Sequence, residues 1–284
     1  MFPLVLALAA SAAWGSADFL GGRASRGVGA LGVATFSKLS GAVGLGVACL
    51  LAAQVPSGEE AAWAFGSGLV GAGALLTLYR ALALGPMSLV APLSACGGAV
   101  PVVVALALGE TPGPVTSAGL AVAFAGALLV SRPAKPEAAV PGMQRVALLN
   151  ALAAALGIGL ALTLLQQAAQ APGDATIGLT FVAALTNASV LVAITLTRGS
   201  GLRIPERQYL PAVIGCGLLD VTANVLFAQA SADGRAAVVA VLGSLYPLMT
   251  VLLARAWLGE RLSGAQAAGV AAAMAGVAAI AAGA

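Results

Sequence analysis

The sequence contains no histidine and few charged residues. Only 8% of its 284 residues are Asp, Glu, Lys or Arg, where a soluble domain has roughly 25%. The lack of histidine removes the commonest metal ligand and the usual proton-relay imidazole. It also excludes the HExxH site of zinc proteases, and no GxxxxGKS/T phosphate loop is present. We therefore expect no enzyme activity, no metal, no cofactor and no ATP-driven transport.

Disulfide chemistry and nucleic-acid binding find no support in the sequence either. The three cysteines, Cys49, Cys96 and Cys216, all lie inside apolar runs, so they indicate no redox compartment. The sequence pI near 9.0 arises from few charges. Those charges fit the loop topology of a membrane protein better than a nucleic-acid interface. We expect no nucleic-acid partner.

Long apolar runs dominate the chain. Apolar residues make up 60% of it, and each run is long enough to cross ~30 Å of hydrocarbon. Ser263 to Gln266 fits a capping box that opens the last run, and Thr111-Pro112 fits the start of the fifth. We predict an all-α polytopic membrane protein with ten transmembrane helices, at about 3–22, 29–53, 61–83, 87–108, 113–131, 145–168, 175–197, 209–231, 235–257 and 263–283.

The second half of the chain repeats part of the first. Residues 88–130 align without a gap on residues 238–280, and the Leu-Gly-Glu turn at 108–110 falls on that at 258–260. Because each half has five spans, an odd number, the second repeat is inverted in the membrane. We predict a first five-helix repeat at 1–131, an inter-repeat loop at 132–144 and a second five-helix repeat at 145–284.

The basic residues gather in alternate loops. Arg235 is the only basic residue in the even-numbered connections between spans. By the positive-inside rule the odd-numbered connections are cytoplasmic and both termini lie outside. The odd-numbered connections and their helix ends hold Arg23, Arg26, Arg80, Arg132, Lys135, Arg145, Arg198, Arg203, Arg207, Arg255 and Arg261.

Several of these features together resemble one transporter family. They are Trp14-Gly15 in the first span, two halves of five spans, and a Leu-Gly-Glu turn before the last span of each half. This pattern resembles the EamA-type branch of the drug/metabolite transporter superfamily. The resemblance implies a ten-helix carrier of the bacterial inner membrane that exports amino acids or related metabolites without ATP. It also implies cytoplasmic termini, opposite to the charge-based orientation, so the orientation stays open.

Glycine and proline interrupt spans four and nine at corresponding places. Span four contains Pro92, Gly97-Gly98 and Pro101, and span nine contains Gly243 and Pro247. Proline removes a backbone donor, so both helices are expected to break or kink near mid-membrane. Such paired interruptions indicate a transporter binding site. The alternative is that they only allow bending and close packing.

Asp220 is the most costly residue to place in a bilayer. It lies near the middle of its span, ~16 Å from each end at ~1.5 Å per residue, where a carboxylate costs at least ~2.5–3.5 kcal/mol. Its surroundings do not match the GxGD pattern of intramembrane proteases. Asn224 lies one turn further on the same face. Asp220 is therefore either the proton-coupling group of a transporter or a structural hydrogen-bond hub with Asn224.

Several other polar and aromatic side chains in the spans each allow two interpretations. Asp18 and Lys38 are expected to form a structural ion pair, or Lys38 captures a substrate carboxylate. Aromatic residues, Phe227 included, either line a cavity or pack. Arg80 is expected to reach the membrane surface, and Glu110 and Glu260 to lie in interfacial turns. The residues predicted to bind substrate are Trp14, Lys38, Tyr79, Gly97, Asn224, Tyr246 and Pro247.

These features favour a secondary transporter for small organic solutes, with alternating access around a midplane cavity. Its partners are then a small-molecule substrate, the lipid bilayer and protons as the coupling ion, and we expect a monomer. A passive uniporter is the main alternative. An intramembrane enzyme is disfavoured because the sequence shows no paired catalytic set. The substrate and the direction of transport stay open.

Overall fold

The computed structural model describes residues 1–84, 96–130, 143–197, 204–258 and 263–283, and no strand occurs within these ranges. The predicted all-α fold is confirmed. The elements are α1 (Phe2–Val28), α2 (Ala30–Ala52), α3 (Gly58–Leu84), η1 (Cys96–Gly98), α5 (Ala99–Ala107), α6 (Pro114–Val130), α7 (Met143–Gln170), α8 (Thr176–Thr197), α9 (Leu210–Asp233), α10 (Ala236–Gly243), α11 (Tyr246–Leu258) and α12 (Gly264–Gly283).

Within the described ranges, six helices are long and apolar enough to cross a membrane: α1, α2, α3, α7, α8 and α9. Shorter apolar helices occupy the predicted spans four, five, nine and ten. The Ser263–Gln266 capping box is confirmed, because each backbone N–H bonds the other side chain, at 3.0 and 3.2 Å. The expected start of span five at Pro112 is wrong. Helix α6 begins at Pro114, which itself has the fixed φ suited to a first helical position.

The predicted break in span nine is confirmed. Helix α10 ends at Gly243, α11 begins at Tyr246, and the chain turns at Ser244-Leu245. Pro247 lies in the first turn of α11, where its missing N–H removes no intrahelical hydrogen bond. In span four a 3-10 turn precedes α5, and Pro92 lies outside the described residues. Both interrupted spans therefore present irregular backbone to the interior.

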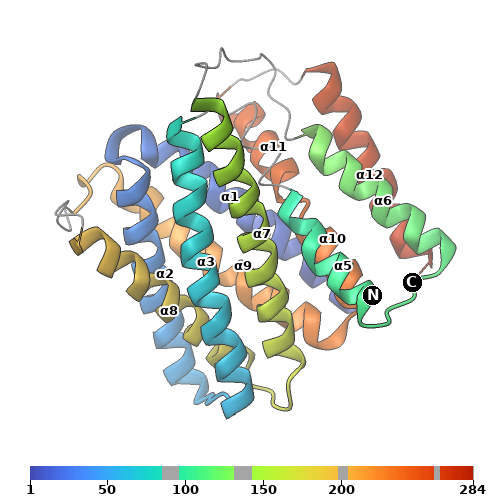
Figure 1. The fold of residues 1–284 in the computed structure, drawn as a ribbon, viewed down its shortest axis with the longest axis horizontal. Helices are drawn as coiled ribbons and strands as arrows, with labels where there is room; N and C mark the ends of the chain where they lie inside the picture. The colour runs from blue at the N-terminus through green and yellow to red at the C-terminus, as the bar shows by residue number, and fades with distance from the viewer. Residues whose placement is uncertain (85–95, 131–142, 198–203, 259–262, 284) are drawn as a thin grey trace.

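The two halves pack on each other in a reciprocal scheme. Helix α3 packs on α7 as α1 packs on α9, and α2 packs on α9 as α3 packs on α8. Each of these contacts becomes its counterpart when the halves are exchanged. Two pairs of equivalent helices also pack directly, α2 with α8 and α6 with α12 (Figure 1). In addition, α5 of span four packs on α10 of span nine. This scheme is that of a two-fold relation between the halves.

Helices α6 and α12 show how the two halves are oriented relative to each other. A Cβ on Gly126 would collide with the backbone of Ala273, and a Cβ on Gly276 would collide with that of Ala123. These contacts exchange under the 150-residue shift of the repeat. Along them the residue number rises in one helix as it falls in the other, so the two equivalent helices are antiparallel (Figure 1). Antiparallel counterparts support the predicted inverted repeat.

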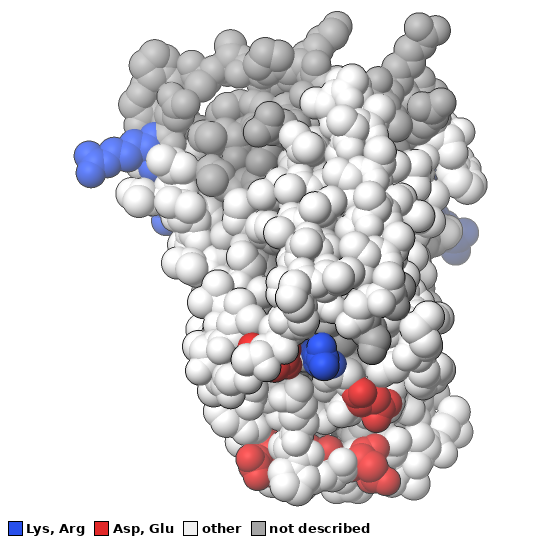
Figure 2. All heavy atoms as spheres, turned by 90° about the vertical axis from the view of Figure 1, so that its right-hand side faces the viewer, with Lys and Arg blue, Asp and Glu red and all other residues white. Residues whose placement is uncertain are grey.

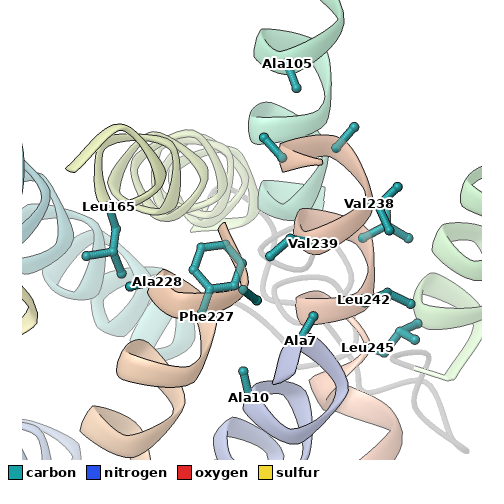
Figure 3. Packing of buried hydrophobic residues seen from close by; sticks show 14 of the residues in the cluster. Ala7, Ala10, Ala105, Leu165, Phe227, Ala228, Val238, Val239, Leu242 and Leu245 are labelled. Carbon is teal, nitrogen blue, oxygen red and sulfur yellow. The ribbon is translucent and has the colours of Figure 1, made fainter. Parts of the chain in front are cut away.

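The core surrounds α10, whose residues are all buried. Phe227 of α9 is fully buried and contacts Trp14, with ring centroids 5.3 Å apart and planes inclined by 50°. Figure 3 shows Phe227 between α7 and α10, with Ala7 and Ala10 of α1 close by. The small alanine side chains let α1 approach the interrupted span. The core thus fixes the position of the break in span nine.

Charge is divided between the two ends of the helix bundle. The acidic side chains of the even-numbered connections gather toward the end that carries both termini (Figures 1 and 2). Arg23 and Arg80, near the opposite end, are exposed, as expected for Arg80. Glu60, only 2% exposed, closes a capping box with Ser57 and also accepts a bond from the backbone N–H of Ala175. The acidic end is therefore partly built from structural hydrogen bonds.

Candidate functional site

A cavity of about 280 Å³ lies between the two halves. Its wall comes from α1, α2 and α3 of the first half and from α7, α8 and α9 of the second. Gly98 from the interruption of span four, and Gly243, Ser244 and Tyr246 from that of span nine, complete it. The irregular backbone of both interrupted spans therefore faces this cavity, as predicted.

An ion pair in the cavity wall joins the two halves. The Nζ atom of Lys38 lies 2.6 Å from Oδ2 of Asp220, and each side chain is 21% exposed. The expected pairing of Lys38 with Asp18 is wrong. Helix α9 crosses α2 at Gly217, where a Cβ would collide with the carbonyl oxygen of Ser37. This close approach brings Asp220, almost one turn beyond Gly217, against Lys38.

Asn224 adds to the same cluster. Its Nδ2 donates to the backbone carbonyl of Asp220 at 2.7 Å and lies 3.4 Å from the Asp220 carboxylate. Both residues line the cavity. Asp220 is thus part of a hydrogen-bonded cluster and part of the cavity wall at once. The position of Asp220 therefore fits both sequence-based hypotheses, a proton-coupling group of a transporter and a structural hydrogen-bond hub with Asn224.

Asp18 is the other acidic residue of the cavity wall. It lies on α1, is exposed, and is within electrostatic range of Lys38 and Asp220. No cation or hydrogen-bond donor among the described residues pairs with its carboxylate. The cavity therefore contains one ion pair and one carboxylate without a counter-ion from the described part of the chain.

The other predicted site residues divide into those that line the cavity and those that do not. Trp14 and Tyr246 line it. Phe227 packs behind Trp14. The side chain of Tyr79 lies outside the described residues. Two predicted residues are not among the lining residues. They are Gly97, where a Cβ would lie 2.6 Å from the carbonyl oxygen of Ala155, and Pro247, which is buried.

Sequence reasoning missed Asn187. It lies on α8 and lines the cavity. Its Oδ1 is buried and has no hydrogen-bond partner among the described residues. A buried acceptor that stays without a partner costs about 1–3 kcal/mol, so Asn187 is expected to lower the stability unless a solute in the cavity donates to Oδ1. The signal was available, because Asn187 is an amide in the middle of an apolar span.

Glu110 does more than occupy an interfacial turn. Its carboxylate accepts hydrogen bonds from the backbone N–H groups of Ala236 and Ala237, at 2.6 and 3.1 Å. A negative charge at a helix N-terminus is favourable, so Glu110 of the first half stabilises the start of α10 in the second. Its repeat counterpart, Glu260, lies outside the described residues.

Comparisons with known proteins agree with this architecture. The model of the EamA-like transporter family matches residues 1–132 and again residues 145–282. A crystal structure described only as that of a protein matches with a TM-score of 0.81 at 18% identity, over 98% of this chain and 94% of that chain. No curated protein matches the sequence. The double family match fits the duplicated sequence, and the structural match shows that the fold occurs in another protein.

Proposed function

Because the chain belongs to the EamA-like transporter family, whose members are multi-pass membrane transporters of small molecules, we propose that it is a secondary exporter of small organic metabolites such as amino acids or related compounds. The observation that carries this proposal is the Lys38–Asp220 pair, which joins the two halves inside the wall of a cavity. Charged side chains in the membrane interior are costly, and where they occur they mark substrate, ion or proton pathways.

In this proposal the halves move against each other about the cavity. Lys38 belongs to the first half and Asp220 to the second, so the pair holds α2 against α9. Protonation of Asp220 removes its negative charge and with it most of the attraction for Lys38. Asp220 is therefore the candidate proton-coupling residue, and Asn224, bonded to its backbone carbonyl, positions it. Trp14 and Tyr246 provide contact surface for the substrate.

The charge distribution supports an orientation for this transporter. The end that carries the termini holds the acidic connections and one basic residue, Arg235 (Figures 1 and 2), while most other basic residues belong to the connections at the opposite end. By the positive-inside rule the basic end is cytoplasmic and both termini lie outside. We also propose that the protein lies in a bacterial inner membrane, as the resemblance to EamA-type carriers implies.

Release of solutes from proteoliposomes tests the proposed function. Vesicles with and without the protein are loaded with a mixture of amino acids and small amines, then moved to acidic medium, and the released solutes are identified by mass spectrometry. We expect at least one solute to leave only the vesicles that contain the protein, and faster when the outside is acidic. A release that ignores the pH gradient would favour a passive uniporter. No release of any solute would contradict both functions.

A further inference from the structure

The cavity wall has an unbalanced charge. Lys38 and Asp220 neutralise each other at 2.6 Å, which leaves Asp18 as the carboxylate that the described part of the chain does not neutralise. No other Asp, Glu, Lys or Arg is among the lining residues that the structure describes. A carboxylate inside a membrane that has no counter-ion must either take up a proton or bind a positively charged partner. A bound organic cation is such a partner.

The surroundings of Asp18 suit an organic cation. Trp14 lies one turn before Asp18 on α1, so both side chains occupy the same face. Both also line the cavity, as does Tyr246 of α11. The faces of such rings attract ammonium groups, with about 0.5–2 kcal/mol for each contact. A carboxylate beside two aromatic rings, in an otherwise largely apolar wall, thus offers both charge and ring contacts to an ammonium group.

We propose that the cavity binds one small organic cation, with its ammonium group against Asp18 and its body against Trp14 and Tyr246. This inference rests on the proposed function, and it narrows the substrate to cationic rather than zwitterionic solutes. A zwitterion would also need a free cation for its carboxylate. Within the described wall, Lys38 is already committed to Asp220.

The same charges provide a way to couple the cation to a proton. When Asp220 accepts a proton, Lys38 loses its partner and its flexible side chain can turn to Asp18, displacing the bound cation. The site then holds either one proton or one organic cation, and its total charge is the same in both states. The titratable groups around Asp18 are Lys38 from α2, Asp220 and Cys216 from α9, and Tyr246 from α11.

Three related compounds separate charge from shape in a direct test. Choline carries a permanent positive charge, 3,3-dimethylbutan-1-ol is its neutral carbon isostere, and betaine is the corresponding zwitterion. Binding of each is measured by the shift in melting temperature of the purified protein in detergent. The variants are Asp18→Asn, which removes the charge, Asp18→Glu, which keeps it, and Asp174→Asn, which removes a charge from an exposed loop residue.

We expect choline alone to stabilise the wild-type protein and the Asp174→Asn control. Asp18→Asn should weaken choline binding by about 10- to 100-fold, the range for losing a charged partner, and Asp18→Glu should retain it. Equal effects of choline and its neutral isostere on the wild-type protein would overturn the proposal, and so would choline binding that survives in Asp18→Asn. The wild-type comparison decides even if Asp18→Asn fails to fold.

The outcomes also separate this inference from the proposed function. Vesicles that release amino acids, together with a protein that ignores choline, would leave the transporter standing and overturn the cation site. Choline binding that depends on Asp18, together with vesicles that release nothing, would support the cation site and overturn the transporter.

Discussion

Three charged side chains set the chemistry of the cavity. Lys38 can neutralise one carboxylate at a time, and in the structure that carboxylate is Asp220. Asp18 faces the same space without a partner from the described residues. Because all three lie at membrane depth, any change in the charge of one alters the energy of the other two. Substitutions at these positions are therefore expected to be strongly non-additive.

Removal of the charge of Asp220 should redirect Lys38 to Asp18. We expect Asp220→Asn to weaken choline binding by about 10-fold or more, because a charged partner is worth at least ~1.5 kcal/mol. The double variant Lys38→Gln with Asp220→Asn leaves Asp18 free again and should restore binding. Isothermal titration with choline measures all three proteins. A double variant as weak as Asp220→Asn would show that Lys38 does not exchange partners.

Asn187 is expected to lower the stability of the protein while contributing to transport. Its buried Oδ1 has no partner among the described residues, so Asn187→Leu, of similar size, should raise the stability by about 1–3 kcal/mol. The same change removes a polar group from the cavity wall and should slow transport. Asn150→Leu is the control, because that amide already donates to the carbonyl of Val146 at 2.8 Å. A lower melting temperature for Asn187→Leu, measured in detergent, would contradict this interpretation.

Much of the arrangement of helices could be predicted from the sequence, because it depends on local patterns. The length of the apolar runs predicted the spans. Ser263 and Gln266 predicted the capping box, and Gly243 with Pro247 predicted the break in span nine. The partner of Lys38 could not be predicted in this way. It lies 182 residues away and depends on which helix of the second half crosses α2.

That crossing depends on a glycine. At Gly217 a Cβ would collide with the carbonyl oxygen of Ser37, so Gly217→Ala should push α9 away from α2 and lengthen the Lys38–Asp220 contact. We expect a loss of about 1–3 kcal/mol in stability, as for other overpacked sites, and weaker choline binding. Gly73→Ala, where nothing lies within 4 Å of the added carbon, is the matched control. Equal melting temperatures for the two variants would show that the crossing tolerates a side chain.

At the scale of the whole molecule, the two halves exchange equivalent contacts. Gly126 meets Ala273 as Gly276 meets Ala123, and Gly68 of α3 meets the carbonyl of Ala183 on α8 as Gly217 of α9 meets that of Ser37 on α2. With this relation, one arrangement of the halves can open the cavity to one side of the membrane. The same arrangement with the roles of the two halves exchanged opens the cavity to the other side. The duplicated architecture is thus suited to alternating access.

The orientation of the molecule follows from its charged ends. Gln208, exposed at the basic end, and Asp174, exposed at the acidic end, are suitable positions for single cysteines in a variant without Cys49, Cys96 and Cys216. We expect Asp174→Cys to react with a membrane-impermeant thiol reagent in intact cells and Gln208→Cys to resist it. The reverse pattern would place both termini in the cytoplasm, as the family resemblance implies.

The central claim is that the cavity exchanges one proton for one organic cation. The most direct test is choline release from proteoliposomes under two separate driving forces, a pH gradient at zero membrane potential and a potassium diffusion potential at equal pH. Because the site carries the same charge in both states, we predict that the pH gradient drives release and that the potential alone does not. Release that follows the membrane potential and ignores the pH gradient would contradict the exchange.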